Sequence, residues 1–468
     1  MPNIDAAMVG PLQAVPPVET LLCHLLIVRH NDSEVLLHKN GEYHSLPRIE
    51  IPRWRRIAPY LVPAVTKQLG IEAVCRLSFE GAERYVLLDP LDESGVGASG
   101  LVWTSIHKIH WSESEIDLTR DFHTALQRAT FQSASDPPVP FSGPRWFEEI
   151  QDWVESHLRR HGVTLSGRWL QYNIGPWFSL LRFETDALPV WFKAVGAPNL
   201  REYAITLELA KLSSKHLPLL IASEPRWHGW LMSEAAGKPL DEKVDLNGWK
   251  IVARSLATLQ IQSIPENELL LAAGCGDLRA EALRLQIRPF LQVAEQLMTM
   301  QPSTPPPILQ RLELQWIEDQ LQNAIGELQS AAMPDAINHL DLNAGNILVA
   351  RHGATFLDWM EGCIAHPFLT FEYLSVLLNR LRPGYESWQG VLREAYCDPW
   401  RHLYSETQIV HMLQRAPLIA PYALAINIVG SEHDGRNISP NLQKLLRSLT
   451  RRMFAAAQRI AAPRSTRF

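Results

Sequence analysis

The stretch 338–362, NHLDLNAGNILVARHGATFLDWMEG, constrains the fold of this chain more than any other feature. It places His339, Asp341 and Asn346 in the spacing H-x-D-x-x-x-x-N, and the apolar runs ILVA and ATFL follow before Asp358. Each apolar run has the length of a short strand, and RHG between them is a turn signal. The stretch therefore predicts a hairpin that carries polar side chains at both of its ends.

These polar side chains are suited to phosphate transfer. An aspartate such as Asp341 can orient an acceptor hydroxyl and take its proton, while Asn346 and Asp358 supply hard oxygen ligands for Mg²⁺. One carboxylate and one amide are sufficient, because Mg²⁺ prefers phosphate oxygens and water for its other ligands. The alternative is that Asp341, Asn343 and Asn346 are turn residues whose side chains bond their own backbone.

The composition is that of an ordinary soluble protein. The chain has 468 residues, of which 46% are hydrophobic and 20% are charged, so its length suggests two or three domains. The formal net charge is -6, and the basic residues are spread along the chain. This distribution argues against nucleic acid as a partner.

The cysteines and the termini indicate the compartment. Five cysteines, odd in number and without C-x-x-C spacing, argue against a disulfide framework or a zinc site. The N-terminus lacks a charged region followed by an apolar core, and we find no segment apolar for long enough to span a bilayer. We therefore expect a cytoplasmic protein with no membrane anchor.

The first part of the chain shows mixed α/β signals. A helix is predicted from about Ala58 to Leu69, ended by Gly70, and the pair Ser112 and Glu115 makes a capping box for another helix. The apolar segments that favour strands are 21–28, 34–39, 41–47, 85–90 and 100–109.

A Pro-, Ser- and Gly-rich stretch, 133–146, then marks a domain boundary. An amphipathic helix follows, and the segments WLQY, FSLLRFE and PVWFKAV predict a small antiparallel sheet. Asn199 and Glu202 form a capping box that opens a helix through about His216, after which GWLMSEA is a further strand.

From about Asp245 onward the apolar spacing is mostly helical, and Pro289 is expected to end or kink one of these helices. The fold class is therefore α+β. The expected domains are an α/β domain over 1–135, a linker over 136–146, a small lobe over 147–240 and a mainly helical lobe over 241–468.

Residues 165 to about 460 resemble the aminoglycoside phosphotransferase and choline kinase family, whose two-lobed fold is similar to that of protein kinases. The resemblance is carried by HLDLNAGNIL followed by FLDWMEGCIAHPF, where the family commonly shows H-G-D-L-H-x-G-N-I-L and then I-D-W. It implies ATP and Mg²⁺ as cofactors and a small-molecule hydroxyl as acceptor. By resemblance, Asp341 is the catalytic base, Asn346 and Asp358 bind Mg²⁺, and His339 holds the loop.

The same resemblance implies a nucleotide site. Lys193 in PVWFKAV falls at the strand lysine that contacts the phosphates, and backbone groups from Ser233 to Ala235 would hold the adenine edge. The glutamate that pairs with Lys193 is either Glu202 or Glu208. We favour Glu208, because Glu202 already belongs to the capping box.

The chain departs from the family pattern at a few positions. Leu340 replaces a usual glycine, Asn343 replaces a common histidine, and Gln260 stands where a helix often carries histidine. None of these removes a charged catalytic group. His366 replaces an acidic residue of the family, which leaves the acceptor side open, and Trp359 is either a core residue or a wall of the acceptor pocket.

The first domain resembles a degenerate Nudix domain, with strand, turn, strand and then a helix that ends in LGI. In that helix, Ala64, Lys67 and Gln68 occupy the positions where Nudix hydrolases carry metal-binding carboxylates. Without those oxygens, metal-assisted hydrolysis of a diphosphate has no support, so we expect a binding or docking role. A generic accessory domain is the alternative.

Together these features predict an ATP- and Mg²⁺-dependent kinase that phosphorylates a hydroxyl of a small molecule. The alternative from another class is a pseudokinase-like regulatory protein that binds nucleotide without chemistry. The retention of Asp341, Asn346, Asp358 and Lys193 argues against that alternative.

Overall fold

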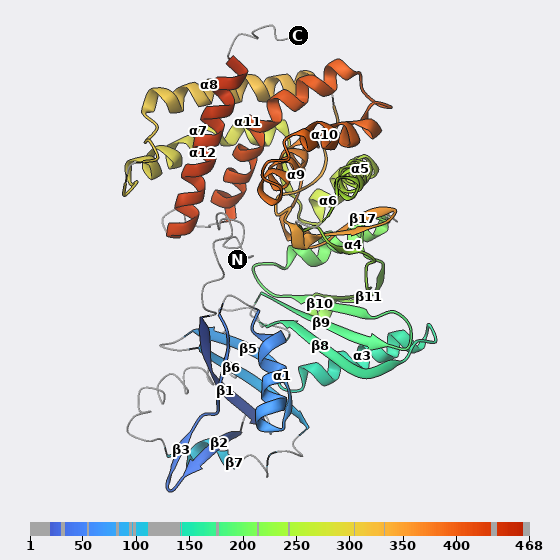
Figure 1. Ribbon diagram of the computed structural model, residues 1–468, viewed down its shortest axis with the longest axis vertical. Helices are drawn as coiled ribbons and strands as arrows, with labels where there is room; N and C mark the ends of the chain where they lie inside the picture. Colours follow the sequence, from blue (N-terminus) through green and yellow to red (C-terminus); the bar gives the residue numbers. More distant parts are fainter. Residues whose placement is uncertain are drawn as a thin grey trace. The chain divides into compact units, whose positions relative to one another are not determined.

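The computed structural model describes residues 19–29, 33–53, 56–80, 84–92, 96, 100–110, 141, 143–174, 177–212, 215–241, 244–303, 305–331, 333–431 and 438–461. These residues form two compact units. The sheet unit comprises 19–203 with 219–234, and the helical unit comprises 204–218 with 235–461 (Figure 1). Helices and sheets occur in both units, which confirms the expected mixture of helix and sheet.

The sheet unit begins with a seven-stranded sheet in which β1 is central. Its strands are β1 (Thr20–Arg29), β2 (Glu34–Asn40), β3 (Tyr43–Ser45), β4 (Arg48–Pro52), β5 (Glu72–Glu80), β6 (Arg84–Asp92) and β7 (Leu101–Ser105). The order is β3-β2-β1-β6-β5, with β4 paired to β1 and β7 to β2, and β1 runs parallel to β6. The helix α1 (Ala58–Leu69) ends at Gly70 with φ 70°, so both predicted ends are confirmed.

A five-stranded antiparallel sheet follows in the same unit. It is formed by β8 (Leu165–Asn173), β9 (Phe178–Thr185), β10 (Val190–Val195), β11 (Leu220–Glu224) and β12 (Gly229–Ser233), in the order β11-β12-β10-β9-β8. The helix α3 (Trp146–Arg159) precedes it, and five of its apolar side chains are buried. The helix and the strands predicted for this region are confirmed.

The two sheets of this unit share a buried core. Val74 of β5 belongs to the same hydrophobic cluster as Phe141, which lies within the predicted linker, and Trp146, which is its last residue. The Gln171 side chain of β8 accepts a hydrogen bond from the Cys75 backbone N–H at 2.9 Å and donates to the Cys75 carbonyl at 2.7 Å. Because Gln171 is buried, it joins the edge strands β5 and β8 as a neighbouring strand would.

Two sequence expectations about helix ends differ from the structure, and a third concerns residues that the structure does not describe. The helix expected to reach His216 is α4 (Arg201–Lys211), which ends five residues earlier. Pro289 was expected to end or kink its helix, and the first of these alternatives is wrong, since α7 (Ala280–Thr299) runs through it. The helix expected from Ser112 and the linker residues 136–140 and 142 lie outside the described residues.

The helical unit is built on one large hydrophobic core. Its longer helices are α5 (Leu246–Ser263), α7, α8 (Arg311–Ser330), α9 (Phe368–Leu381), α10 (Ser387–Trp400), α11 (Glu406–Ser431) and α12 (Pro440–Ala461). By length and composition, 25 residues of α11 could cross a membrane, contrary to the expectation that no segment is apolar for long enough. However, 61% of the tested window is buried inside the protein, so α11 serves as a core helix.

Two small sheets of the helical unit carry the stretch 338–362. One has the order β13-β16-β17, with β13 at Lys238–Pro239, and contains the predicted hairpin, β16 (Ile347–Ala350) with β17 (Gly353–Phe356). The other has the order β14-β18-β15, with β14 at Gly276–Leu278, and in it β15 (Ala336–His339) is an edge strand paired with β18 (Gly362–Ala365). The predicted strands on either side of the RHG turn are confirmed.

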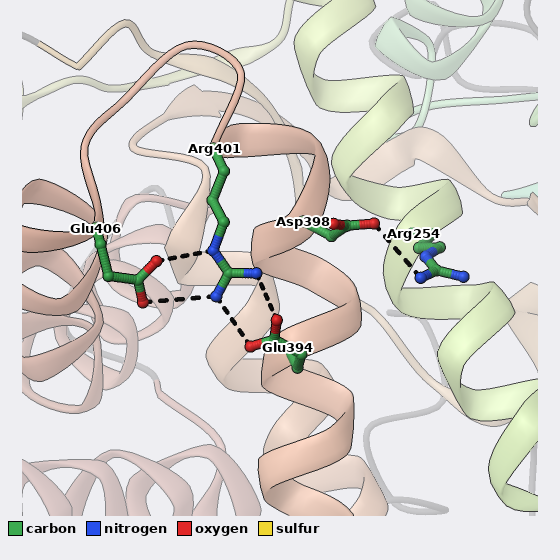
Figure 2. A network of polar contacts seen from close by, with 5 residues as sticks. All are labelled: Arg254, Glu394, Asp398, Arg401 and Glu406. Carbon is green, nitrogen blue, oxygen red and sulfur yellow. Dashed lines mark hydrogen bonds and ion pairs between the residues drawn. The ribbon is translucent and has the colours of Figure 1, made fainter.

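Helices α5 and α10 pack side by side and are joined both in the core and at the surface. At the surface, Arg254 of α5 donates to Asp398 of α10 at 3.4 Å. Figure 2 shows that Arg401, just after α10, lies between Glu394 and Glu406 and bonds both carboxylates. In the core, the Tyr396 hydroxyl of α10 donates to Gln260 of α5 at 2.6 Å.

Candidate active site

Asp341 lies in the turn between β15 and β16 and is held by two asparagines. The Asn343 amide nitrogen lies 3.2 Å from each carboxylate oxygen of Asp341. The Asn346 amide nitrogen donates to the Asp341 carbonyl at 3.0 Å and lies 3.3 Å from its carboxylate. The turn is thus tied to the side chain expected to act as the base.

The sequence indicated Asn343 as a departure from a family pattern and as a possible turn residue, but its contact with the Asp341 carboxylate was not predicted. Asn343 also caps the short 3-10 turn Ala344–Asn346, because its side-chain oxygen accepts from the Gly345 N–H at 2.9 Å. The i, i+2 spacing from Asp341 was the available signal, since Asx side chains commonly bond groups two residues away. Asp341, Asn343 and Asn346 are therefore turn residues, as the alternative interpretation expected, and they also belong to the candidate site.

The surroundings of Asp341 favour the protonated form of its carboxyl group more than water does. Burial raises the pKa of this carboxyl above its ordinary value, and the nearby carboxylates of Asp358 and Glu361 raise it further. His339 and the hydrogen bond from Asn343 act in the opposite direction. A local excess of negative charge therefore surrounds Asp341.

His339 joins the two halves of the site. Its Nε2 lies 2.9 Å from the carbonyl oxygen of Leu357, the residue before Asp358. Because a carbonyl only accepts, Nε2 must carry the proton, and the ring is a donor at this position. The expected role of His339 as a structural holder agrees with this bond.

Asp358 has a backbone conformation that non-glycine residues seldom adopt. Its φ is 64° and its ψ is 70°, in the left-handed region. The preceding residue is fixed by two bonds, from the Leu357 N–H to the Asn346 carbonyl at 2.9 Å and from His339 to the Leu357 carbonyl. Such strain is kept only where surrounding contacts enforce it, as these do, and it commonly marks a functional position.

Glu361 is a further acidic residue of this region that sequence analysis did not single out. Its carboxylate accepts from the Asn427 amide of α11 at 2.8 Å, and its backbone carbonyl accepts from the Leu340 N–H at 3.2 Å. The partner Asn427 is 66 residues away in sequence. No local pattern could have indicated this pairing.

The donor set fits a hard divalent cation that also binds phosphate oxygens. The Asn346 amide nitrogen is used on Asp341, so its amide oxygen is the atom able to ligate a cation, beside the Asp358 carboxylate. Among the described residues, no group of three or more His, Cys, Asp or Glu side chains could hold a metal alone. This suits Mg²⁺, which takes few protein ligands and completes its shell with water and phosphate.

Lys193 of β10 lies in the sheet unit, where it pairs with Glu202 and not with Glu208. The ammonium bonds the Glu202 carboxylate, and the two side chains are 9% and 3% exposed. The aromatic rings of Phe178 and Trp230 lie 5.2 and 5.7 Å from the Lys193 nitrogen. Lys193 and Glu202 therefore form a buried ion pair, with two aromatic rings close to the ammonium group.

The preference for Glu208 was wrong because it ignored which face of α4 is buried. Glu202, Ile205 and Leu209 are buried and follow helical spacing, whereas Glu208 falls outside this face. Glu208 bonds Lys211 at 2.5 Å, one turn along the same helix. A residue in the first turn of a helix can thus pair with a lysine of a neighbouring strand.

Two backbone N–H groups of the segment expected to hold adenine are used inside the sheet unit. The Ser233 N–H donates to the Leu219 carbonyl, and the Glu234 N–H donates to the Pro189 carbonyl, both at 3.0 Å. The adenine contacts expected of Ser233 and Ala235 stay a prediction. Gly237 follows with φ 118°, where a Cβ would lie 2.7 Å from the Val349 backbone, so only glycine fits there.

His366 and Trp359 are structural in this fold. The His366 Nδ1 accepts from the Phe368 N–H at 3.3 Å at the start of α9, and complete burial lowers the pKa of the ring to about 3. The Trp359 ring is buried, packs against His339 at 4.8 Å between centroids, and donates to the Phe356 carbonyl. Trp359 is thus a core residue, and His366 is an uncharged cap.

No family model matches the chain, and no curated protein matches its sequence. Among solved structures, it is similar to macrolide 2'-phosphotransferase MphH from Brachybacterium faecium, with 17% identity, a TM-score of 0.42 and coverage of 68% of this chain and 100% of that chain. It is also similar to an ethanolamine kinase from Plasmodium vivax, with 12% identity, a TM-score of 0.44 and coverage of 72% and 96%.

A third similar structure is spectinomycin phosphotransferase APH(9)-Ia in complex with ADP and spectinomycin, with 13% identity, a TM-score of 0.38 and coverage of 66% and 98%. By their names, these proteins transfer phosphate to small molecules. At such identities and TM-scores, the similarity establishes neither the family nor the activity of this chain.

Proposed function

We propose that this protein is an ATP- and Mg²⁺-dependent phosphotransferase that moves the γ-phosphate to a hydroxyl of a small molecule. The observation that carries the proposal is the closure of one loop around Asp341. Asn343 and Asn346 bond this carboxylate, while His339 ties the strand before it to the Leu357–Asp358 turn. These bonds link the segments that carry Asp341 and Asp358, which are 17 residues apart in sequence, and they support the proposed roles of Asp341 as the base and of Asn346 and Asp358 as cation ligands.

The roles of the residues follow from phosphoryl-transfer chemistry. Asp341 would orient the acceptor hydroxyl and take its proton, and Asn346 and Asp358 would hold Mg²⁺, which when bound neutralises phosphate charge. Lys193, oriented by Glu202, would contact the nucleotide phosphates, and backbone groups at Ser233 and Ala235 would hold the adenine edge. Catalysis would rest on positioning and charge neutralisation.

The raised pKa of Asp341 is consistent with this role. A carboxyl group whose neighbours are carboxylates is poised to keep a proton, and a cation at Asn346 and Asp358 would offset the same negative charge. The acidic surroundings therefore support cation binding and proton acceptance at one place.

For the seven-stranded sheet we propose a docking or binding role as a degenerate Nudix-like module. At the positions expected for metal carboxylates, α1 carries Ala64, Lys67 and Gln68, and its first turn holds no acidic residue. The buried Gln171–Cys75 contact supports a permanent attachment to the five-stranded sheet. We further propose a cytoplasmic location, which the five buried free cysteines support.

The experiment is ADP release from ATP, measured with Mg²⁺ over a panel of amino alcohols, sugars and aminoglycosides. Asp341→Asn keeps the shape and one acceptor oxygen but removes the base, so turnover should fall at least about 100-fold while ATP still binds. Asp398→Asn, a surface change in the same unit, is the matched control and should turn over like wild type.

Full turnover by Asp341→Asn would disprove the role of Asp341. Nucleotide binding by wild type without transfer to any acceptor or to water would instead favour the pseudokinase-like alternative.

A further inference from the structure

The outer edge of β15 is buried, and helix hydroxyls accept its hydrogen bonds where another strand would otherwise do so. In the sheet β14-β18-β15, only one side of β15 is paired with a strand. Backbone N–H groups of alternate residues point to the other side, so Ile337 and His339 need acceptors there. The Ser263 hydroxyl accepts from Ile337 at 2.9 Å, and the Thr370 hydroxyl accepts from His339 at 3.0 Å.

The Thr370 hydroxyl is itself oriented by Asn338. It donates to the Asn338 side-chain oxygen at 2.6 Å, which also accepts from the Thr370 N–H at 3.1 Å. The Asn338 amide nitrogen donates to the carbonyls of Ala336 and Ala365 at 3.0 and 2.9 Å. With its proton committed to Asn338, the Thr370 hydroxyl can only accept from His339.

Two residues from helices α5 and α10 add hydrogen bonds next to the contact between Asn338 and Thr370. Gln260 of α5 donates to the Pro367 carbonyl at 2.9 Å, just before α9 begins, and Tyr396 of α10 donates to Gln260. All four side chains are uncharged and at most 1% exposed: Asn338, Gln260, Thr370 and Tyr396. We name this set the β15 network.

His339, whose backbone the β15 network holds, links the turn that carries Asp341 to the turn that carries Asp358. The His339 backbone is held by Thr370, and its ring bonds the carbonyl before Asp358. Asp341 follows two residues after His339. A shift of His339 would therefore move the base and the cation ligand relative to each other.

We propose that Thr370 is a positioning residue, which acts through His339 to set the distance between Asp341 and Asp358. This inference rests on the proposed function and names a further residue of the same site. Its chemistry requires a hydroxyl that accepts from a backbone N–H, so serine should replace threonine and valine should not. The β15 network holds Thr370 in the one orientation that meets this need.

The test compares Thr370→Val, Thr370→Ser and a matched control, Ser263→Ala, which removes the neighbouring hydroxyl from the same strand edge. In Thr370→Val, kcat for ADP release should fall about 10- to 100-fold while KM for ATP stays within about twofold. Thr370→Ser should restore most of kcat. Ser263→Ala should keep kcat within about threefold, because its partner Ile337 is four residues before Asp341 in the sequence, whereas His339 is two residues before it.

Hydrogen exchange of the peptide 336–346 provides a readout that does not need activity. Exchange should become faster in Thr370→Val and return toward the wild-type rate in Thr370→Ser. Wild-type exchange in Thr370→Val, or equal losses of kcat in Thr370→Val and Ser263→Ala, would overturn the positioning role. Absence of ADP release by wild type would count against the proposed function alone, while the exchange result would still decide whether Thr370 holds the loop.

Discussion

Helix α10 takes part in two polar networks that differ in almost every physical respect. Tyr396 faces the core and belongs to the uncharged β15 network, in which the side chains are nearly inaccessible to water. Glu394 and Asp398 face the surface, where they bond Arg401 and Arg254 (Figure 2). The two carboxylates that hold Arg401 are 67% and 59% exposed.

The difference shows where geometric precision comes from in this protein. Exposed ion pairs are weakened by water and salt, so they contribute little to the folded state. Buried uncharged groups cost less to desolvate than charges, yet each bond left unmade is costly. The strand that leads to Asp341 is therefore held by neutral side chains, and the charged side chains Glu394 and Asp398 of α10 lie at the surface.

The ion pair of Lys193 and Glu202 is charged, like the surface network, and buried, like the β15 network. Removing one of its partners should have the largest effect on stability. Glu202→Ala leaves a buried ammonium without its carboxylate, which should lower the free energy of unfolding by about 3 to 5 kcal/mol. Glu208→Ala on the same helix is the control and should cost less than about 0.5 kcal/mol. Urea unfolding followed by tryptophan fluorescence measures both, and equal effects would contradict the pairing seen here.

Asn338→Leu tests the neutral network itself. The change removes the five hydrogen bonds of the Asn338 side chain and leaves the Thr370 N–H without this acceptor, so the free energy of unfolding should fall by about 3 kcal/mol. The same urea titration applies. A loss below about 1 kcal/mol would show that the network is not tightly satisfied.

Tyr396→Phe removes one hydroxyl from the β15 network and should cost about 1 to 2 kcal/mol, because the Gln260 oxygen loses its donor. The cost should not change between pH 4 and pH 9, since burial keeps the pKa of Tyr396 well above its ordinary value of 10.0. Thermal unfolding across this pH range checks the prediction. A cost that varies with pH would mean that a charged group takes part.

Arg401→Met should have the smallest effect, a change in the midpoint of thermal unfolding below about 2 °C. Hydrogen bonds from Arg401 lower the pKa values of Glu394 and Glu406 below their usual 4.5. Their contribution is therefore present above pH 4.5 and is lost as pH falls through the lowered pKa values. Any effect of Arg401→Met should also vanish in 1 M salt, and an effect that persists there would argue for a buried role.

Local sequence signals predicted the elements that depend on neighbours in the chain. The ends of α1, the strands β8, β9 and β10, of which β10 carries Lys193, and the hairpin before Asp358 all follow from apolar runs bounded by turn residues. Asp341 and Asn346 were brought together as expected, because five residues separate them.

Contacts between distant segments could not be predicted in this way. Thr370 is 31 residues from His339, and Tyr396 is 136 residues from Gln260, so no spacing rule connects them. The choice of Glu208 failed because the buried face of α4 is set by tertiary packing, which overrides a plausible local cap. His366 likewise became a helix cap through burial that its neighbours in sequence do not indicate.

The most direct test of the proposed phosphotransfer site is ATP binding by titration calorimetry, with and without Mg²⁺, on wild type and on Asp358→Ala. We expect binding that depends on Mg²⁺ in wild type and is lost in Asp358→Ala, because this carboxylate would hold the cation that bridges the phosphates. Binding that is indifferent to both Mg²⁺ and Asp358, or no binding at all, would contradict a phosphotransfer site built on Asp341, Asn346 and Asp358.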